Sequence, residues 1–163
     1  MGTFLVTGAS GFVGAALSQR LLQDGHSVRL LVRAPSDALP KHERASVHVV
    51  SLGDPNALAE AAAGVEVLYH CASESSPRAV RSAYGWINVA GTENVLNAAR
   101  FAGVRRVVHL SCTQASLVDR DRMNWKESHP LGDQPLDALC RSRLLAEELA
   151  LHASAPRMQV CVL

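Results

Sequence analysis

The sequence predicts an α/β fold in which a parallel sheet of about six strands is flanked by helices on both faces, a doubly wound arrangement. Short apolar runs alternate along the whole chain with segments of helical period. The apolar runs read as continuous Val and Leu stretches, which is typical of strands buried on both faces. Because 163 residues suffice for one core, we expect a single domain spanning residues 1–163.

The individual elements follow in order from these patterns. Six apolar runs are expected to form strands, at residues 3–7, 27–32, 47–50, 65–70, 107–111 and 159–163. Helical patterns lie between them, at residues 14–24, 56–63, 85–102 and 136–153, while residues 33–46 read as loop. Turn residues agree with this division, because Gly25, Gly64 and Gly103 each follow a helical pattern.

A glycine-rich turn between the first predicted strand and the first helix predicts a dinucleotide-binding site. Gly8, Gly11 and Gly14 are spaced three residues apart. This spacing suits a tight turn that lets backbone approach a pyrophosphate, while the helix that opens there directs free N–H groups at the phosphates. Residues 73–82 and 117–135 lack strong periodicity and follow later strands at their carboxyl ends, where open α/β sheets bind ligands.

Composition gives no argument for nucleic-acid or membrane binding. The chain is 48% hydrophobic and 19% charged, with a formal net charge of +1. No uninterrupted apolar run approaches the roughly 18–20 residues of a membrane span. Because the chain enters a strand and the glycine turn at once, we expect no signal peptide and a cytoplasmic location.

The cysteines and histidines are not spaced as metal ligands. Cys71, Cys112, Cys140 and Cys161 lie far apart, without a C-x-x-C pair, and the seven histidines show no ligand spacing. We therefore expect reduced cysteines in apolar surroundings, no disulfide framework and no metal site.

A series of motifs, taken in order along the chain, carries a resemblance to a known family. The motifs are the glycine turn at residues 7–14, then residues 31–33, 54–58, 70–73, 88–96 (Asn-Val-x-Gly-Thr-x-Asn-Val-Leu), 107–111 and 142–147. The sequence resembles the extended short-chain dehydrogenase/reductases, the NAD(P)-dependent epimerase/dehydratase group that includes dihydroflavonol reductase-like proteins. The resemblance implies a Rossmann fold from Thr3 to Leu163.

The resemblance also implies the residues that contact the cofactor. These positions are Gly8, Ser10, Gly11, Phe12, Val13, Gly14, Arg33, Ser51, Leu52, Ala72, Ser73 and Arg143. Ala72 and Ser73 match the loop that passes the nicotinamide ribose, and Asn88 matches an asparagine that steadies neighbouring strands. Ser51 stands where the family often has an aspartate that reaches the adenine amino group, so we expect one strong contact fewer.

Arg33, at the end of the second predicted strand, bears on the choice between NADP and NAD. NAD-specific relatives carry an acidic residue near this position, which accepts hydrogen bonds from both ribose hydroxyls. A guanidinium instead pairs in a forked fashion with the 2′-phosphate of NADP. Lys41 would add a second positive charge if its loop folds back. We therefore expect NADP, with NAD as the alternative in which Arg33 is merely a solvated residue at a strand end.

The catalytic pair of the family is replaced in this chain. Relatives place a tyrosine and, four residues on, a lysine on one face of a helix, where the ammonium lowers the pKa of the phenol. The matching residues are Leu139, which has no proton to give, and Arg143, which is not an acid at neutral pH. Cys112, a weaker donor, stands at the family's serine position. The catalytic residues therefore stay unassigned.

Substitute proton donors remain open, because no spacing argument favours one of them. The conceivable groups near predicted strand ends are Cys112, His70, His109 and Glu74. Tyr69 falls inside a predicted strand, and Tyr84 matches an aromatic residue that packs at the start of the long helix in relatives.

Three interpretations of function remain. The first is an NADP-preferring oxidoreductase or epimerase, or its cofactor domain, with altered catalytic residues and a small carbonyl or nucleotide-sugar substrate. The second is a non-catalytic NADP-binding sensor or interaction module, and the third is a degenerate domain that binds weakly. Because relatives generally continue past the sixth strand into a smaller substrate domain, we expect that domain to be absent or truncated here.

The resemblance further implies a homodimer, because relatives pair two helices of each subunit as a four-helix bundle. Apolar residues available for it on the two long helical patterns are Trp86, Ile87, Val95, Leu96, Leu136, Leu139, Leu144 and Leu149. The alternative is that at least half of these side chains face the sheet.

Overall fold

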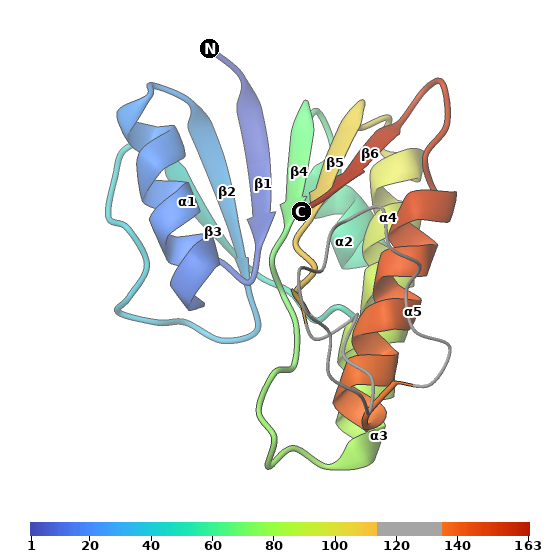
Figure 1. Cartoon of the computed structure of the whole chain (residues 1–163). Helices are drawn as coiled ribbons and strands as arrows, with labels where there is room; N and C mark the ends of the chain where they lie inside the picture. The colour runs from blue at the N-terminus through green and yellow to red at the C-terminus, as the bar shows by residue number, and fades with distance from the viewer. Residues whose placement is uncertain (114–134) are drawn as a thin grey trace.

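The computed structural model describes residues 1–113 and 135–163 and shows a parallel sheet with helices on both faces (Figure 1). The strands are β1 (Thr3–Thr7), β2 (Ser27–Val32), β3 (Ala45–Val49), β4 (Val67–His70), β5 (Arg106–His109) and β6 (Gln159–Val162). The helices are α1 (Phe12–Gln23), α2 (Pro55–Ala62), α3 (Arg81–Tyr84), α4 (Gly91–Phe101) and α5 (Ala138–His152), with a π-helical segment η1 (Gly85–Ala90). The predicted doubly wound α/β fold is confirmed.

The strand order is β3-β2-β1-β4-β5-β6, and every neighbouring pair is parallel. The chain begins at the centre of the sheet, runs outward through β2 and β3, and then returns to the other side of β1. This reversal brings the carboxyl ends of β1 and β4 together at the topological switch point, where doubly wound sheets bind ligands. Thr7 there lies between Leu31 of β2 and His70 of β4.

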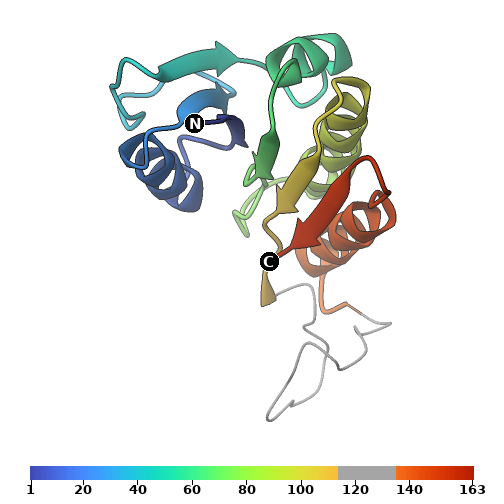
Figure 2. The same ribbon diagram turned by 90° about the horizontal axis from the view of Figure 1, so that it is seen from above.

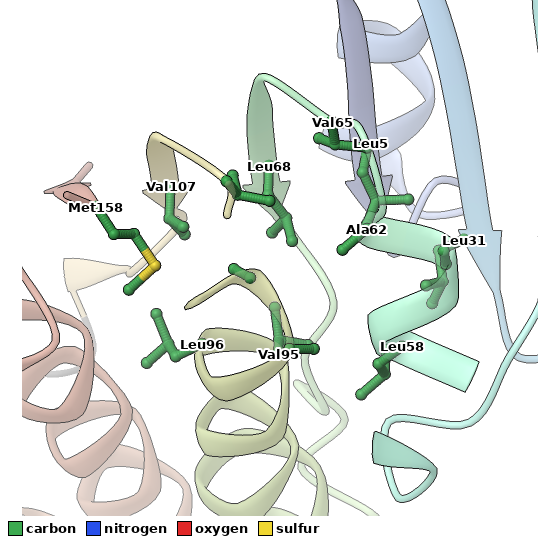
Figure 3. Packing of buried hydrophobic residues seen from close by; sticks show 14 of the residues in the cluster. Leu5, Leu31, Leu58, Ala62, Val65, Leu68, Val95, Leu96, Val107 and Met158 are labelled. Atoms are coloured by element: carbon green, nitrogen blue, oxygen red, sulfur yellow. The ribbon is translucent and has the colours of Figure 1, made fainter. Parts of the chain in front are cut away.

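Helix α1 covers one face of the sheet, and α2, α4 and α5 cover the other (Figure 2). The larger hydrophobic cluster lies on the second face (Figure 3), and its buried members include Leu5, Leu31, Leu58, Leu68, Val95, Leu96 and Val107. On the first face, Leu21 and Leu22 of α1 share a cluster with Val6 and Leu30. Strands that are buried on both faces explain why their sequences do not alternate between apolar and polar residues.

The long helical pattern at residues 85–102 departs from the expectation of one regular helix. Helical structure begins four residues earlier, at Arg81, and passes through η1 before α4. Within this region the Thr92 hydroxyl donates to the carbonyl oxygen of Asn88 at 2.6 Å. Apolar periodicity does not distinguish a single turn of π-helix from α-helix, so η1 could not be predicted from the sequence. Such segments are frequent at functional sites.

Other element bounds differ from the expectation by one or two residues. β4 begins at Val67 rather than Val65, because Gly64 adopts a φ of +70° and the Val65 N–H donates to Ala62 in the turn that ends α2. Among residues 1–113 and 135–163, no helix has the length and hydropathy of a membrane span. The aperiodic stretch predicted at residues 117–135 falls almost wholly outside the described residues.

Candidate functional site

The glycine turn joins β1 to α1 and is held in shape by contacts that only glycine permits. Gly8 has a φ of +65°, and a Cβ there would lie 2.7 Å from the backbone of Ala72. A Cβ on Gly14 would lie 2.2 Å from the carbonyl oxygen of Gly8. The Gly11 N–H donates to that same oxygen at 2.9 Å. The three glycines therefore bring the turn, the start of α1 and the loop after β4 into direct backbone contact.

The N-terminus of α1 offers unsatisfied donors beside this turn. Its N-cap residue, Gly11, provides no side-chain hydrogen bond to the first turn of the helix. The N–H groups of Phe12 and Val13 consequently lack intrahelical acceptors and stand at the positive end of the helix dipole. This arrangement suits a phosphate group. The side chain of Phe12, by contrast, is 95% exposed and points its ring into solvent.

A cleft of about 650 Å³ opens at the carboxyl ends of β1, β2, β3 and β4. Of the cofactor positions expected from the sequence, those that line it are Gly8, Ser10, Gly11, Arg33, Ser51, Leu52, Ala72 and Ser73. Phe12, Val13, Gly14 and Arg143 do not line it. The cleft falls within the volume range of small-molecule and cofactor sites.

The sequence did not single out several residues that line the cleft as cofactor contacts. They are Leu31, Val32, residues 34–36, Val50, Gly53, Cys71, Glu74, Trp86 and Ile87. Most of them adjoin a predicted position in the chain, so the strand-end rule could have included them. Trp86 and Ile87 come instead from η1, whose geometry had no sequence signal. Burial raises the pKa of the Cys71 thiol to about 11, so this side chain meets the cleft as a neutral group.

Arg33 is exposed and lines the cleft just beyond β2, and Glu74, after β4, is a second charged residue of the lining. Asp37, the nearest acidic residue that follows in the sequence, does not line it. Lys41 lies elsewhere, in a separate hollow against α1 that includes Gln19 and Gln23. The second positive charge that Lys41 would supply is therefore not at this cleft in the structure.

The turn after β3 is fixed by its own hydrogen bonds. Ser51 Oγ accepts from the Gly53 N–H at 3.1 Å. The Asp54 carboxylate caps α2 by accepting from the Ala57 N–H at 3.1 Å. The Asn94 amide of α4 donates to the carbonyl oxygen of Leu52 at 2.8 Å. Asp54 is thus engaged as a helix cap, and the turn is tied to α4.

A buried chain of hydrogen bonds runs through His70 beneath the cleft. The Ala72 N–H donates to Thr7 Oγ1 (3.2 Å), which lies 2.7 Å from His70 Nδ1. On the other side, His70 Nε2 lies 3.0 Å from Thr92 Oγ1. Because the single Thr92 hydroxyl proton is donated to the carbonyl oxygen of Asn88, His70 Nε2 must be the donor to Thr92. His70 is therefore protonated at Nε2, and Nδ1 accepts from the Thr7 hydroxyl.

A second histidine and a guanidinium lie beside this chain. The rings of His70 and His109 are 5.3 Å apart between centroids. Burial, followed by the nearby His109 and the charge of Arg143, lowers the pKa of His70 to about 3. Burial, followed by the charge of Arg143, lowers the pKa of His109 to about 4. Both imidazoles are neutral at physiological pH, so neither is a ready general acid.

Arg143 is 8% exposed, and its Nε has no hydrogen-bond partner. The Nδ1 of His109 likewise has none. Within the described residues the only ion pair joins Arg20 and Asp24 on α1, so Arg143 has no carboxylate partner there. The guanidinium therefore keeps a donor available at the carboxyl end of the sheet.

Leu139 and Cys112 are two of the positions that the resemblance matches to the family's catalytic groups. Leu139 lies in the first turn of α5 and is 6% exposed. Its carbonyl oxygen accepts from the Ser142 hydroxyl at 2.8 Å, and Ser142 Oγ accepts from the Asn88 amide at 2.9 Å. Cys112 is half-buried just beyond β5. Among the described residues, which include all four cysteines, there is no disulfide and no cluster able to hold a metal ion.

The two tyrosines of the chain are both engaged in structural contacts. Tyr69 is in β4 and packs edge-on against Phe4, with ring centroids 6.1 Å apart. Tyr84 is buried, and its hydroxyl donates to the carbonyl oxygen of Ser76 at 2.8 Å. Both side chains therefore hold the fold together, as the sequence led us to expect.

Comparison with known proteins places these features in a family. The profile described as the NAD dependent epimerase/dehydratase family matches residues 4–163. A 4-hydroxy-2-methyl-3-oxo-4-farnesyl-3,4-dihydroquinoline-1-oxide ketoreductase from Stigmatella aurantiaca is 40% identical, over 96% of this chain and 47% of its own length. A putative dihydroflavonol 4-reductase from Synechocystis sp. is 34% identical, over 98% of this chain and 47% of its own length.

Solved structures agree with this relationship. A short-chain dehydrogenase/reductase superfamily protein from Agrobacterium tumefaciens, with bound NAD, matches with a TM-score of 0.84 and 33% identity over 98% of this chain and 48% of that chain. MoeE5 in complex with UDP-glucuronic acid and NAD matches with a TM-score of 0.86 and 28% identity, over 99% of this chain and 53% of that chain. The chain thus spans about half the length of these relatives. It belongs to the NAD-dependent epimerase/dehydratase family of extended short-chain dehydrogenase/reductases.

Proposed function

We propose that the chain binds NADP in the cleft at the carboxyl ends of β1–β4, as the cofactor-binding part of an oxidoreductase or epimerase. The observation that carries this proposal is Arg33, a permanent cation that lines the cleft where NAD-specific relatives have an acidic residue. A guanidinium forms short, charge-assisted hydrogen bonds with a phosphate such as the 2′-phosphate of NADP. The NAD-bound relatives support a nicotinamide dinucleotide, and NAD is the alternative ligand.

The proposed placement puts the pyrophosphate over the glycine turn and the start of α1. Ser10 and Gly11 line the cleft there, with the Phe12 and Val13 N–H groups beside them. Arg143 of α5 would contact the nicotinamide ribose, because its Nε is a donor without a partner in the described residues. A nicotinamide, when bound, supplies or accepts the hydride. This chain's own residues would bind and orient the cofactor.

Titration of the chain with NADPH and NADH tests the cofactor. We expect tighter binding of NADPH, and we expect Arg33→Glu to weaken NADPH binding by roughly 10- to 100-fold, because a charge-assisted contact is replaced by repulsion. NADH binding should change much less. Arg157→Glu is the matched control, since it makes the same change of charge just before β6, outside the cleft. Equal affinity for the two nucleotides in the unaltered chain would overturn the NADP preference.

The substrate proposed is a small carbonyl compound or a nucleotide sugar. The names of two relatives, a ketoreductase and a complex with UDP-glucuronic acid, support these two classes. A non-catalytic NADP-binding sensor or interaction module is the second candidate. It is favoured by Leu139, a buried side chain that has no proton to give at the family's tyrosine position. The third interpretation, a degenerate domain, differs from these two candidates because it would bind both NADPH and NADH weakly.

A homodimer and a cytoplasmic location are also proposed. Half of the apolar residues considered for the dimer are instead buried in this chain, namely Val95, Leu96, Leu139 and Leu144. Trp86 and Leu136 stay 73% and 56% exposed. Sedimentation equilibrium of the chain would measure the monomer–dimer equilibrium, and a monomer at all concentrations would remove the dimer proposal.

A further inference from the structure

The cofactor cleft has an aromatic wall that the family motifs do not account for. Trp86 and Ile87 of η1 line the cleft together with residues 50–53, which follow β3. The Trp86 side chain is nevertheless 73% exposed, so most of the indole surface is open. An indole at the rim of a cleft with an open face offers a surface on which a flat aromatic ligand can stack.

The spacing between this wall and the turn after β3 is fixed. A Cβ added to Gly91, at the junction of η1 and α4, would lie 3.0 Å from Leu52 Cδ1. The Asn94 amide, one turn further along α4, holds the carbonyl oxygen of Leu52 at 2.8 Å. The turn after β3 is therefore packed against the start of α4 and bonded to it. A ring entering between Trp86 and residues 50–53 would meet two walls that are already in place.

Two buried anchors set the direction of Trp86. Tyr84, two residues before it, is 5% exposed and bonds to the carbonyl oxygen of Ser76. Asn88, two residues after it, is 2% exposed and bonds to both Glu74 and Ser142. Residues two apart on a helix do not face the same way. The backbone is therefore fixed on both sides of Trp86, and the Trp86 side chain points away from the helix face that carries Tyr84 and Asn88.

We propose that Trp86 stacks on the adenine ring of the dinucleotide and is a principal contact for the adenylate half. This inference rests on the proposed function. In a doubly wound fold the adenosine ribose lies at the end of the second strand, beside Arg33 here. Adenine then extends toward residues 50–53, where Ser51 Oγ accepts from the Gly53 N–H and keeps its own proton as a donor. Stacking on Trp86 adds a contact with the ring face, which the hydrogen-bonding groups of this turn do not provide.

Binding of ADP-ribose, which contains the adenine but no nicotinamide, tests the proposal. Trp86→Ala should raise its dissociation constant by about tenfold, the effect of losing one base–aromatic stack. Trp86→Phe, which keeps an aromatic face, should recover most of the affinity. Phe101→Ala is the matched control, because Phe101 is 86% exposed at the end of α4 and does not line the cleft. Thermal unfolding midpoints would verify that each variant is folded.

Fluorescence gives an independent readout of the same contact. The chain has two tryptophans, so Trp125→Phe leaves Trp86 as the sole indole. ADP-ribose should quench the emission of this variant, and nicotinamide mononucleotide should not. Unchanged ADP-ribose affinity in Trp86→Ala would overturn the role of Trp86 while leaving the proposed function intact. Failure of the unaltered chain to bind either ADP-ribose or NADPH would instead overturn the proposed function, and this inference with it.

Discussion

Thr7 Oγ1 and His70 Nδ1 lie 2.7 Å apart at the carboxyl ends of the adjacent strands β1 and β4, and both side chains are buried. The same Thr7 oxygen accepts the N–H of Ala72, a residue that lines the cleft. His70 in turn donates to Thr92 of α4. One threonine hydroxyl therefore connects the strand below the glycine turn, the loop that forms the cleft wall and the helix that covers the sheet.

Thr7→Val is expected to destabilise the fold, because it keeps the shape of the side chain but removes the hydroxyl. The Ala72 N–H and His70 Nδ1 would both lose their partner, at about 1–3 kcal/mol for each unsatisfied group. Urea unfolding should show the free energy of unfolding reduced by roughly 2–6 kcal/mol. Thr7→Ser, which retains the hydroxyl, should lose much less. Equal stability of Thr7→Val and the unaltered chain would refute the hydrogen-bond chain.

The two buried histidines make stability depend on pH. The pKa of His70 is lowered to about 3 and that of His109 to about 4, whereas both are near 6.5 when unfolded. Below pH 6.5 the unfolded chain therefore binds protons that the folded chain does not bind. The free energy of unfolding contributed by these groups is fully present above pH 6.5. It should fall toward pH 4 by up to about 1.4 kcal/mol per pH unit for each histidine.

Urea titrations between pH 7.5 and pH 4.5 would measure this slope. His109→Asn should reduce it by about half, because one of the two histidines is removed. His152→Gln is the matched control, since it removes a histidine that is exposed at the end of α5. A slope that does not respond to His109→Asn would contradict the assignment.

The sheet could be predicted from the sequence, because parallel strands that are buried on both faces have continuous apolar sequences. Residues 3–7 and 27–32 were predicted with the bounds that β1 and β2 have. The glycine turn, Arg33, Ser51 and the loop at Ala72 could be predicted as cleft-lining for a related reason. Each of them follows a strand at its carboxyl end, and those ends converge in a doubly wound sheet.

The parts that escaped prediction depend on contacts between residues distant in the sequence. Thr7 and His70 are 63 residues apart, so no local pattern links them. The histidines read as conceivable proton donors, whereas burial keeps them neutral. Trp86 lies in η1 and lines the cleft. The hydrogen bonding of a π-helical segment differs from that of an α-helix, but the apolar pattern of the sequence does not change with it.

Gly14→Ala should disrupt the glycine turn more than other glycine substitutions. The added Cβ would lie 2.2 Å from the backbone oxygen of Gly8, which cannot move without shifting β1 or α1. We expect a loss of at least about 2 kcal/mol in unfolding free energy, as for overpacking, and loss of NADPH binding. Gly85→Ala is the control, because its Cβ would meet no atom within 4 Å. NADPH binding to Gly14→Ala with the affinity of the unaltered chain would refute the role of the turn.

Leu139→Tyr combined with Arg143→Lys separates a disabled enzyme from a binding module. The two residues lie four apart on α5 and are 6% and 8% exposed, so both substitutions fall on one buried face. In a disabled enzyme, a phenol beside an ammonium restores general acid catalysis, and oxidation of NADPH by small ketones should rise by roughly 10²- to 10⁴-fold. Leu139→Phe with Arg143→Lys is the matched control, because it has the same bulk and charge without the hydroxyl. A folded, NADPH-binding Tyr–Lys variant that turns over no faster than this control would favour the sensor or interaction module, because the lost donor would then not be what prevents catalysis.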